Sequence, residues 1–259
     1  MSSIYEDMDI EQIIKFFSNC SSTDACYDGQ DISSSDTVSS TREKSSHRSD
    51  KAKFIINDGI LERFHGEDAA VYVPDTVTVI GEAAFSGCNN LKAVVVPDCL
   101  TEIRSNAFAY CSSLRSFYVP ESVTVIGTNA FTGCNQLQGI CIPESVTKIG
   151  RGAFSFCEKL ETVAVSLNLD EISDYSFFNC KNLNEILIPP SAKRIGLSAF
   201  ENCINLKMVN IYKPDIQIEY GAFRNCRGLC YVHAPDLICD RIAAEYSKTP
   251  FALMRKNCK

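Results

Sequence analysis

The residues with the greatest chemical potential in this chain are its 14 cysteines and three histidines. A catalytic cysteine needs a base beside its thiolate, and a structural zinc site needs four Cys or His ligands, which usually come as close pairs. The histidines, His47, His65 and His233, are far apart, and no Cys-x-x-Cys pair occurs. Cys226 and Cys230 have no second pair beside them. We therefore expect no catalytic residue, no metal site and no cofactor.

Half of the cysteines occupy one position of a 23-residue repeat. Each lies three residues after a phenylalanine and three before a leucine, without insertion or deletion over seven units. The three series are Phe85, Phe108, Phe131, Phe154, Phe177, Phe200 and Phe223; Cys88, Cys111, Cys134, Cys157, Cys180, Cys203 and Cys226; and Leu91, Leu114, Leu137, Leu160, Leu183, Leu206 and Leu229. This regularity favours a structural role, in which the thiols stack as small hydrophobic side chains.

The remaining apolar positions of the repeat indicate a strand. Each unit reads Leu-x-x-Val-x-Val, and an isoleucine stands five residues before each phenylalanine, from Ile80 to Ile218. One such coil cannot bury its apolar face alone, so coils must stack and equivalent side chains must form ladders. Prolines follow the strand segment at positions 97, 120, 143, 189 and 235. We predict a parallel strand at this segment and a short turn of helix or 3-10 helix at Ala-Phe-x-x-Cys on the opposite side.

The repeated Ala-Phe-x-x-Cys-x-x-Leu unit resembles the BspA-type leucine-rich-repeat family over about residues 54–255. The expected fold is a leucine-rich-repeat solenoid, a curved right-handed stack of short parallel strands with turns or short helices on the opposite side. The resemblance also implies protein binding and surface adhesion, the roles with which this family is associated.

Four substitutions depart from the repeat. Ser166 and Tyr212 replace prolines, Ser176 replaces an alanine, and Asp215 stands where valine or leucine is expected. None of them changes the register. We therefore expect local irregularity in the fourth, sixth and seventh units.

The repeats define four segments of the chain. Residues 1–50 form an acidic, Ser-rich tail, 51–75 a degenerate amino-terminal cap repeat, 76–235 the seven repeats, and 236–259 a carboxy-terminal cap. The family resemblance implies a small hairpin at the entry. We predict a short helix over 237–247 and a terminal strand over 250–254, because terminal units must cover the open ends of the core.

The tail has too few apolar residues to repay the entropy of ordering, so we expect it to be disordered. It holds ten acidic and four basic side chains. Ile10, Ile13, Ile14 and Phe17 would share one face of a short helix. Such a helix is either a docking peptide for the groove of a partner or a frayed helix laid on the solenoid or on nothing.

Composition narrows the classes of partner. The chain has a net charge of -7, most of it in the tail, so the near-neutral body lacks the basic stripe that nucleic acids or anionic membranes require. No apolar run is long enough for membrane insertion. The first residues lack the pattern of a secretory leader, so we expect a cytoplasmic protein, with the cell surface by a signal-independent route as the alternative.

Positions between the core residues of each strand should point outward. This predicts a partner-binding face that contains Val95, Tyr118, Cys141, Leu187, Met208, Asn210, Tyr231 and His233. Tyrosine, leucine and methionine often anchor protein interfaces, although the same variation could serve solubility alone. The function predicted is a protein-interaction scaffold that is not an enzyme, and the alternative is an adhesin-like surface protein that recognises a host or matrix protein.

Carboxylates form a second aligned feature. Asp98, Glu121 and Glu144 each follow a proline by one residue. They form either a solvated acidic rim or a contact stripe for a basic partner.

Overall fold

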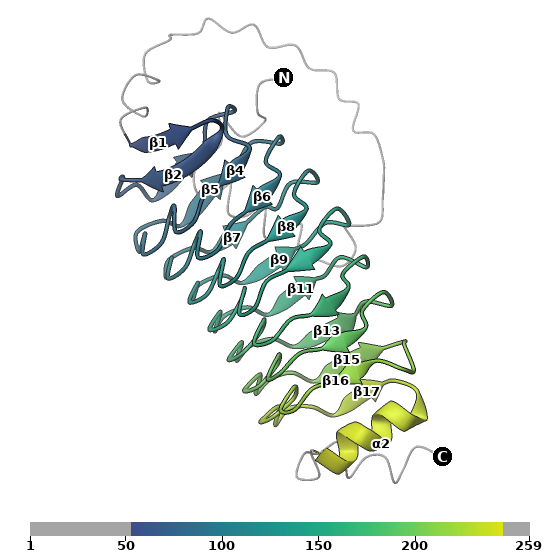
Figure 1. Ribbon diagram of the computed structural model, residues 1–259. Coiled ribbons are helices and arrows are strands. Elements are labelled where there is room, and N and C mark those ends of the chain that lie inside the picture. The colour runs from purple at the N-terminus through teal and green to yellow at the C-terminus, as the bar shows by residue number, and fades with distance from the viewer. Residues whose placement is uncertain (1–52, 246–259) are drawn as a thin grey trace, which may run out of the picture.

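The computed structural model describes residues 53–245, which form one continuous stack of coils (Figure 1). Each coil contributes a strand to a first row of parallel strands, as the sequence predicts. Residues 23 apart pair throughout this row, for example Val94 with Phe117 and Val209 with Val232. The row consists of β3 (Ala70–Tyr72), β5 (Ala93–Val95), β7 (Ser116–Phe117), β9 (Gly139–Cys141), β11 (Thr162–Ala164), β13 (Glu185–Ile188), β15 (Met208–Ile211) and β17 (Tyr231–His233). The fold is therefore a parallel-strand solenoid.

A second row of strands, which the sequence did not predict, runs along another side of the stack. Its members have two residues each and end on the repeated, buried isoleucine. They are β4 (Val79–Ile80), β6 (Glu102–Ile103), β8 (Val125–Ile126), β10 (Lys148–Ile149), β12 (Glu171–Ile172), β14 (Arg194–Ile195) and β16 (Gln217–Ile218). One apolar position per unit is too short a pattern to indicate a strand, since strand periodicity needs several alternating residues.

The side of the coil that carries Ala-Phe-x-x-Cys consists of hydrogen-bonded turns, so the prediction of a helical turn there was wrong. Ala83, Phe85 and Gly87 donate their N–H groups to carbonyls 22 residues later, at 2.8 to 3.1 Å. The residues between them donate to carbonyls three residues earlier. Ala83 and Gly87 have φ angles of +55° and +75°, which a right-handed helix cannot accommodate. The turns therefore join neighbouring coils in a third ladder.

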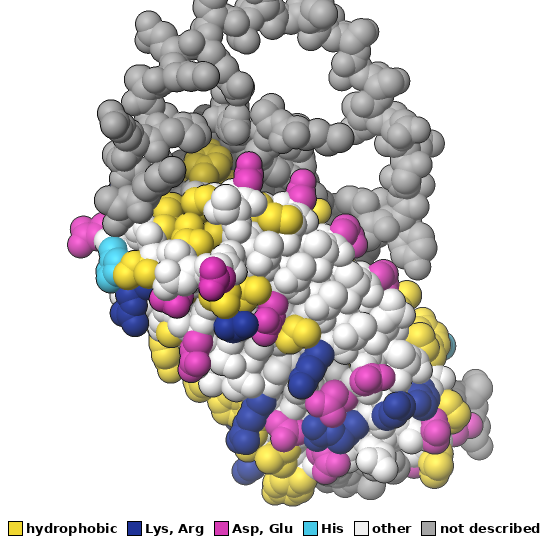
Figure 2. All heavy atoms as spheres, turned by 45° about the horizontal axis from the view of Figure 1, so that its top comes forward, with side chains coloured by type: hydrophobic (Ala, Val, Ile, Leu, Met, Phe, Trp, Pro, Cys, Tyr) yellow, Lys and Arg dark blue, Asp and Glu magenta, His cyan; other side chains and the backbone are white. Residues whose placement is uncertain are grey.

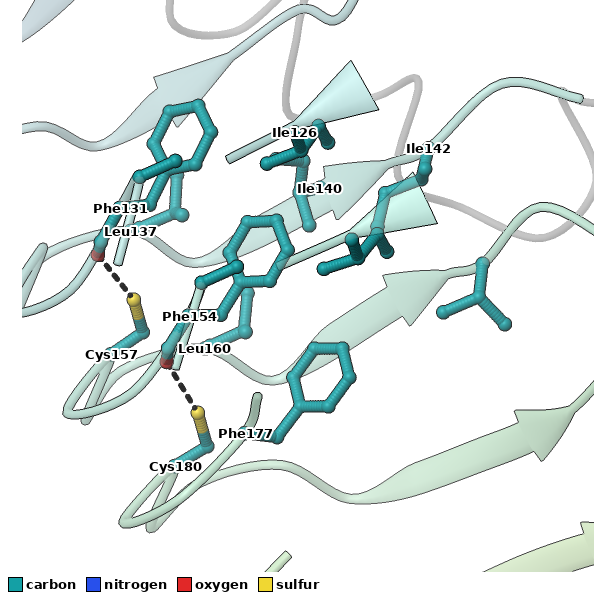
Figure 3. Packing of buried hydrophobic residues seen from close by; sticks show 14 of the residues in the cluster. Ile126, Phe131, Leu137, Ile140, Ile142, Phe154, Cys157, Leu160, Phe177 and Cys180 are labelled. Atoms are coloured by element: carbon teal, nitrogen blue, oxygen red, sulfur yellow. Dashed lines mark hydrogen bonds between the residues drawn. The ribbon is translucent and has the colours of Figure 1, made fainter. Parts of the chain in front are cut away.

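The seven repeated phenylalanines form the centre of the core. Their rings stack with centroids 4.9 to 5.5 Å apart and interplanar angles of 8° or less. Figure 3 shows Phe131, Phe154 and Phe177 in this arrangement, with leucine and isoleucine side chains packed beside them. All seven rings are fully buried. Each coil therefore buries its apolar face on its two neighbours, as a solenoid requires.

Both ends of the described stack are covered. The antiparallel hairpin of β1 (Phe54–Asn57) and β2 (Ile60–Phe64) stands at the first coil, and Phe64 places its ring 5.2 Å from that of Phe85. At the other end, α2 (Asp236–Glu245) buries Ile238 and Ile242 (Figure 1). The tail over 1–50, its short helix and the terminal strand over 250–254 lie outside the described residues.

Only the fourth of the three units expected to be irregular interrupts the strand ladders. Both rows break there, because β10 does not pair with β12 and β11 does not pair with β13. In this unit Ser166 is buried, and its Oγ accepts the N–H of Asn168 at 3.1 Å. The ladder of β13, β15 and β17 continues past Tyr212. Asp215 is exposed, and Ile216 fills the core beside it.

Candidate functional site: the outward face of the first strand row

The repeated cysteines are structural groups of the core. From Cys111 onward, each Sγ donates a hydrogen bond to the carbonyl of the ladder phenylalanine one coil earlier, at 3.0 to 3.2 Å (Figure 3). Burial raises the pKa of the Cys157 thiol to about 12. A thiol that stays protonated is a poor nucleophile and a poor metal ligand. The stacking was predicted from the sequence, whereas the hydrogen bond to the carbonyl was not.

The other candidate chemistry is not brought together. Among residues 53–245, no three His, Cys, Asp or Glu side chains lie close enough to hold a metal ion. His65 follows the amino-terminal hairpin, whereas His233 ends β17 in the last coil. The described part of the chain therefore offers a surface, and not a cluster of reactive groups, as its candidate site.

This surface, which we call the strand face, consists of two outward rows of side chains on the first strand row. The first outward row is Ala70, Ala93, Ser116, Gly139, Thr162, Glu185, Met208 and Tyr231. The second outward row is Tyr72, Val95, Tyr118, Cys141, Ala164, Leu187, Asn210 and His233. In both rows, neighbouring members are 23 residues apart. All eight residues predicted from the sequence lie in these two rows.

The eight predicted residues differ in exposure. Tyr231 is 56% exposed and His233 is also exposed. Five more are half-buried: Tyr118, Cys141, Leu187, Met208 and Asn210.

Val95 is the exception, because only 7% of its surface is exposed and the prediction of an exposed side chain there was wrong. It pairs with Tyr72 of the preceding coil, and Tyr118 occupies the same position in the following coil. A valine between two larger side chains in one row is screened by both.

Two aromatic residues of this region were missed by the sequence reading. Tyr72, which is 41% exposed, lies 23 residues before Val95, so the repeat register alone would have placed it in the second outward row. Tyr212 occupies a proline position just after β15, and its ring meets that of His233 edge to face at 5.6 Å. With Tyr231, these two rings concentrate aromatic surface at the carboxy-terminal end of the strand face.

The strand face changes in character along the stack. In its amino-terminal half, from Ala70 to Cys141, neither row contains a charged residue, and Ala93 and Ser116 are buried. The residues that precede β5 and β7 are Lys92 and Arg115, which line a shallow hollow with Ser112, Ser113, Asn135 and Gln136. In the other half, Thr162 and Glu185 are exposed.

Charged side chains of both signs are interspersed elsewhere. Figure 2 shows Lys and Arg among Asp and Glu over the lower half of the face that it presents. Arg194 contacts Glu171 at 3.0 Å and Asp174 at 2.7 Å, and Lys181 contacts Glu158 at 2.7 Å. These pairs join neighbouring coils and leave no basic stripe on that face. No helix within residues 53–245 is long and apolar enough to cross a membrane.

The stacked 23-residue coils, the parallel strands and the varied strand face together define a leucine-rich-repeat solenoid. The family model for the BspA type leucine-rich repeat region matches six copies, over residues 68–183 and 101–230. The chain belongs to the BspA-type leucine-rich-repeat family.

Solved structures agree with this assignment. A leucine-rich-repeat protein of T. pallidum is 28% identical, with 74% of this chain and 90% of that chain covered and a TM-score of 0.64. One from Bacteroides ovatus is 24% identical, covers 65% of this chain and 61% of that chain, and has a TM-score of 0.49. A leucine-rich cell surface protein from Faecalibacterium prausnitzii is 25% identical, covers 66% and 61%, and has a TM-score of 0.46. The comparison with curated proteins gave no match.

Proposed function

We propose that this chain is a protein-interaction scaffold whose strand face binds a protein partner. The observation that carries the proposal is the contrast between the two sides of each strand. The inward side repeats the same side-chain types in every coil, whereas the outward rows differ from coil to coil and include half-buried Leu187 and Met208 and exposed Tyr231. Side chains of these types are enriched in protein interfaces.

The dimensions of the strand face suit such a role. Eight strands spaced at roughly 4.8 Å give a face close to 40 Å long. A specific complex typically buries about 800 Å² on each partner, which a face of this length can supply. The three ladders that join each coil to the next hold the outward side chains on a rigid support, so little ordering is needed upon binding.

We also propose that the protein does not catalyse a reaction. Its family and fold are typically those of non-catalytic scaffolds, and the buried thiols of the core have raised pKa values. This proposal rests on the described residues alone.

The compartment in which the partner is met separates the scaffold from the adhesin-like alternative. Protease treatment of intact cells, followed by detection of the chain, makes this distinction. Protection from the protease would support a cytoplasmic scaffold, and cleavage would support the adhesin-like alternative.

The binding face itself can be tested with a photo-crosslinking amino acid placed at Tyr231 or at Tyr110. Both side chains are exposed, at 56% and 64%, but Tyr110 lies in the turns beyond Phe108 and not on the strand face. We expect a partner to be crosslinked from position 231 and not from position 110. A partner captured from position 110 alone would contradict the proposal.

A further inference from the structure

The two halves of the strand face differ in their burial as well as in their residue types. In the amino-terminal half, the outward side chains of Ala93, Val95 and Ser116 are buried. The equivalents of Ala93 in later coils, Thr162 and Glu185, are exposed. Ser116 is only 3% exposed, and its Oγ has no hydrogen-bond partner among the described residues. A buried hydroxyl without a partner costs free energy unless another group approaches it, so this half of the face is suited to an occupant.

The chemistry of this half specifies the occupant. Its first outward row contains only small side chains, from Ala70 to Gly139, beside the larger Tyr72 and Tyr118 of the second outward row. Small residues beside large ones allow an apolar ridge of a partner helix to approach the strands closely. Lys92 and Arg115 at the start of the strands favour acidic residues next to that ridge.

The next coils would disfavour the same occupant. Glu161 and Glu185 precede or occupy the strands there, and both are exposed. An acidic occupant would be repelled by these carboxylates. The charges therefore place it on the amino-terminal half of the strand face.

The chain contains a segment of this composition. Between residues 4 and 17, Ile10, Ile13, Ile14 and Phe17 have the spacing of one helix face. The same segment carries four acidic side chains, Glu6, Asp7, Asp9 and Glu11, against a single lysine. An acidic, one-sided apolar helix complements a small-residue groove edged by two basic side chains.

The connection to the stack permits this contact. Residues 18–52 join the segment to β1, which begins at Phe54 beside the first coils. A chain of that length can span more than about 100 Å when extended, so all of the first coils are within reach. Because the segment is tethered, its effective concentration reaches roughly the millimolar range, and a weak interaction suffices.

We propose that residues 4–17 bind, as an amphipathic helix, to the amino-terminal half of the strand face, from Ala70 to Cys141. This inference rests on the proposed function in one respect, that the strand face is an interaction surface. The carboxy-terminal half, with Leu187, Met208 and Tyr231, is then the part open to a separate partner. A partner that needs the whole face must displace the segment.

The test uses the full chain and the thiol of Cys141, which lies in the second outward row. The rate of alkylation by iodoacetamide is measured for individual cysteines by mass spectrometry of peptides. Ile13→Asp places a charge on the apolar stripe, whereas Gln12→Asp places the same charge on the opposite helix face. Cys99, which is exposed in the loop after β5, reports general reactivity, and buried Cys157 reports folding.

We expect Ile13→Asp to accelerate alkylation of Cys141 by about tenfold or more, since it releases the segment from the face. Gln12→Asp should leave that rate unchanged, Cys99 should react equally in all three proteins, and Cys157 should stay unreactive. An unchanged Cys141 rate in Ile13→Asp would overturn the proposal. Equal acceleration by both variants would also overturn it, because the apolar stripe would then have no specific role. No partner is present, so this outcome is independent of the crosslinking test at Tyr231.

Discussion

At the scale of single residues, phenylalanine and cysteine join neighbouring coils in different ways. The rings of the phenylalanine ladder contact the equivalent rings above and below, with centroids 5.2 and 5.4 Å away in the case of Phe131. The cysteine thiol instead satisfies a carbonyl of the preceding coil, and Cys157 bonds to that of Phe131 at 3.2 Å. One residue supplies apolar packing, and the other supplies a small buried donor.

Phe131→Ala should lower the free energy of unfolding by about 3 to 5 kcal/mol, because it opens a cavity between two rings that remain stacked on either side. Urea denaturation followed by circular dichroism measures this loss. Tyr110→Ala, which removes an exposed ring, is the control and should cost much less. A loss below about 1 kcal/mol for Phe131→Ala would contradict the ladder as the main source of stability.

Alkaline pH should destabilise the fold through the buried thiols. Burial raises the pKa of Cys157 from 9.0 to about 12, so its stabilising contribution is complete below pH 9. Above pH 9 the unfolded thiol ionises while the folded one stays protonated, and the free energy of unfolding falls as pH rises toward 12. One thiol contributes a slope of about 1.4 kcal/mol per pH unit in this range.

Cys157→Ser isolates that slope, because serine does not titrate there and its hydroxyl can donate to the same carbonyl. Denaturation of both proteins at several pH values between 8 and 11 gives the comparison. The difference in stability between wild type and variant should shrink as pH rises. A difference that is constant with pH would show that the thiol of Cys157 does not titrate differently in the two states.

At the scale of elements, what the sequence could predict depends on what each element demands of its side chains. Phenylalanine, cysteine and leucine recur without exception because each must stack on its own equivalent, so the first strand row and its register follow from the sequence. The second strand row has one apolar residue per unit and is joined through backbone groups. Such backbone pairing leaves little trace in residue type.

The turns were mistaken for a helical segment for a related reason. Their left-handed positions are filled by glycine in some coils, such as Gly87 and Gly133, but by Tyr110 and Phe156 in others. Only the alignment of all seven units would show that glycine and asparagine dominate these positions. The burial of Val95 was also beyond the reading of one unit, because it depends on residues 23 positions away in both directions.

Deletion of whole coils tests the element scale. Removal of residues 124–146 takes out one full period and rejoins equivalent positions, so a shorter protein should fold cooperatively. Removal of residues 124–134 shifts every later side chain out of its ladder and should prevent cooperative folding. Thermal unfolding of both deletions is the measurement, and equal behaviour of the two would contradict the stacked repeat.

At the scale of the whole molecule, the stack separates stability from recognition. The ladders occupy the inward side of each strand and the turns, whereas the outward rows of the strand face are left to vary. Changes in the strand face should therefore alter binding more than folding. The acidic tail adds charge at one end only, with ten acidic and four basic side chains in residues 1–50.

The central claim is that the strand face binds the partner, and the affinity of a crosslinked and identified partner for Tyr231→Ala tests it most directly. Tyr231 is exposed at the aromatic end of the face, and tyrosines in interfaces commonly contribute about 2 kcal/mol or more, or roughly a thirtyfold change in Kd. The variant should bind about thirtyfold more weakly while its melting temperature stays within a few degrees of wild type. Tyr110→Ala, on the turn side, should keep full affinity. If Tyr231→Ala binds as tightly as wild type, or Tyr110→Ala loses the affinity instead, the strand face is not the binding surface.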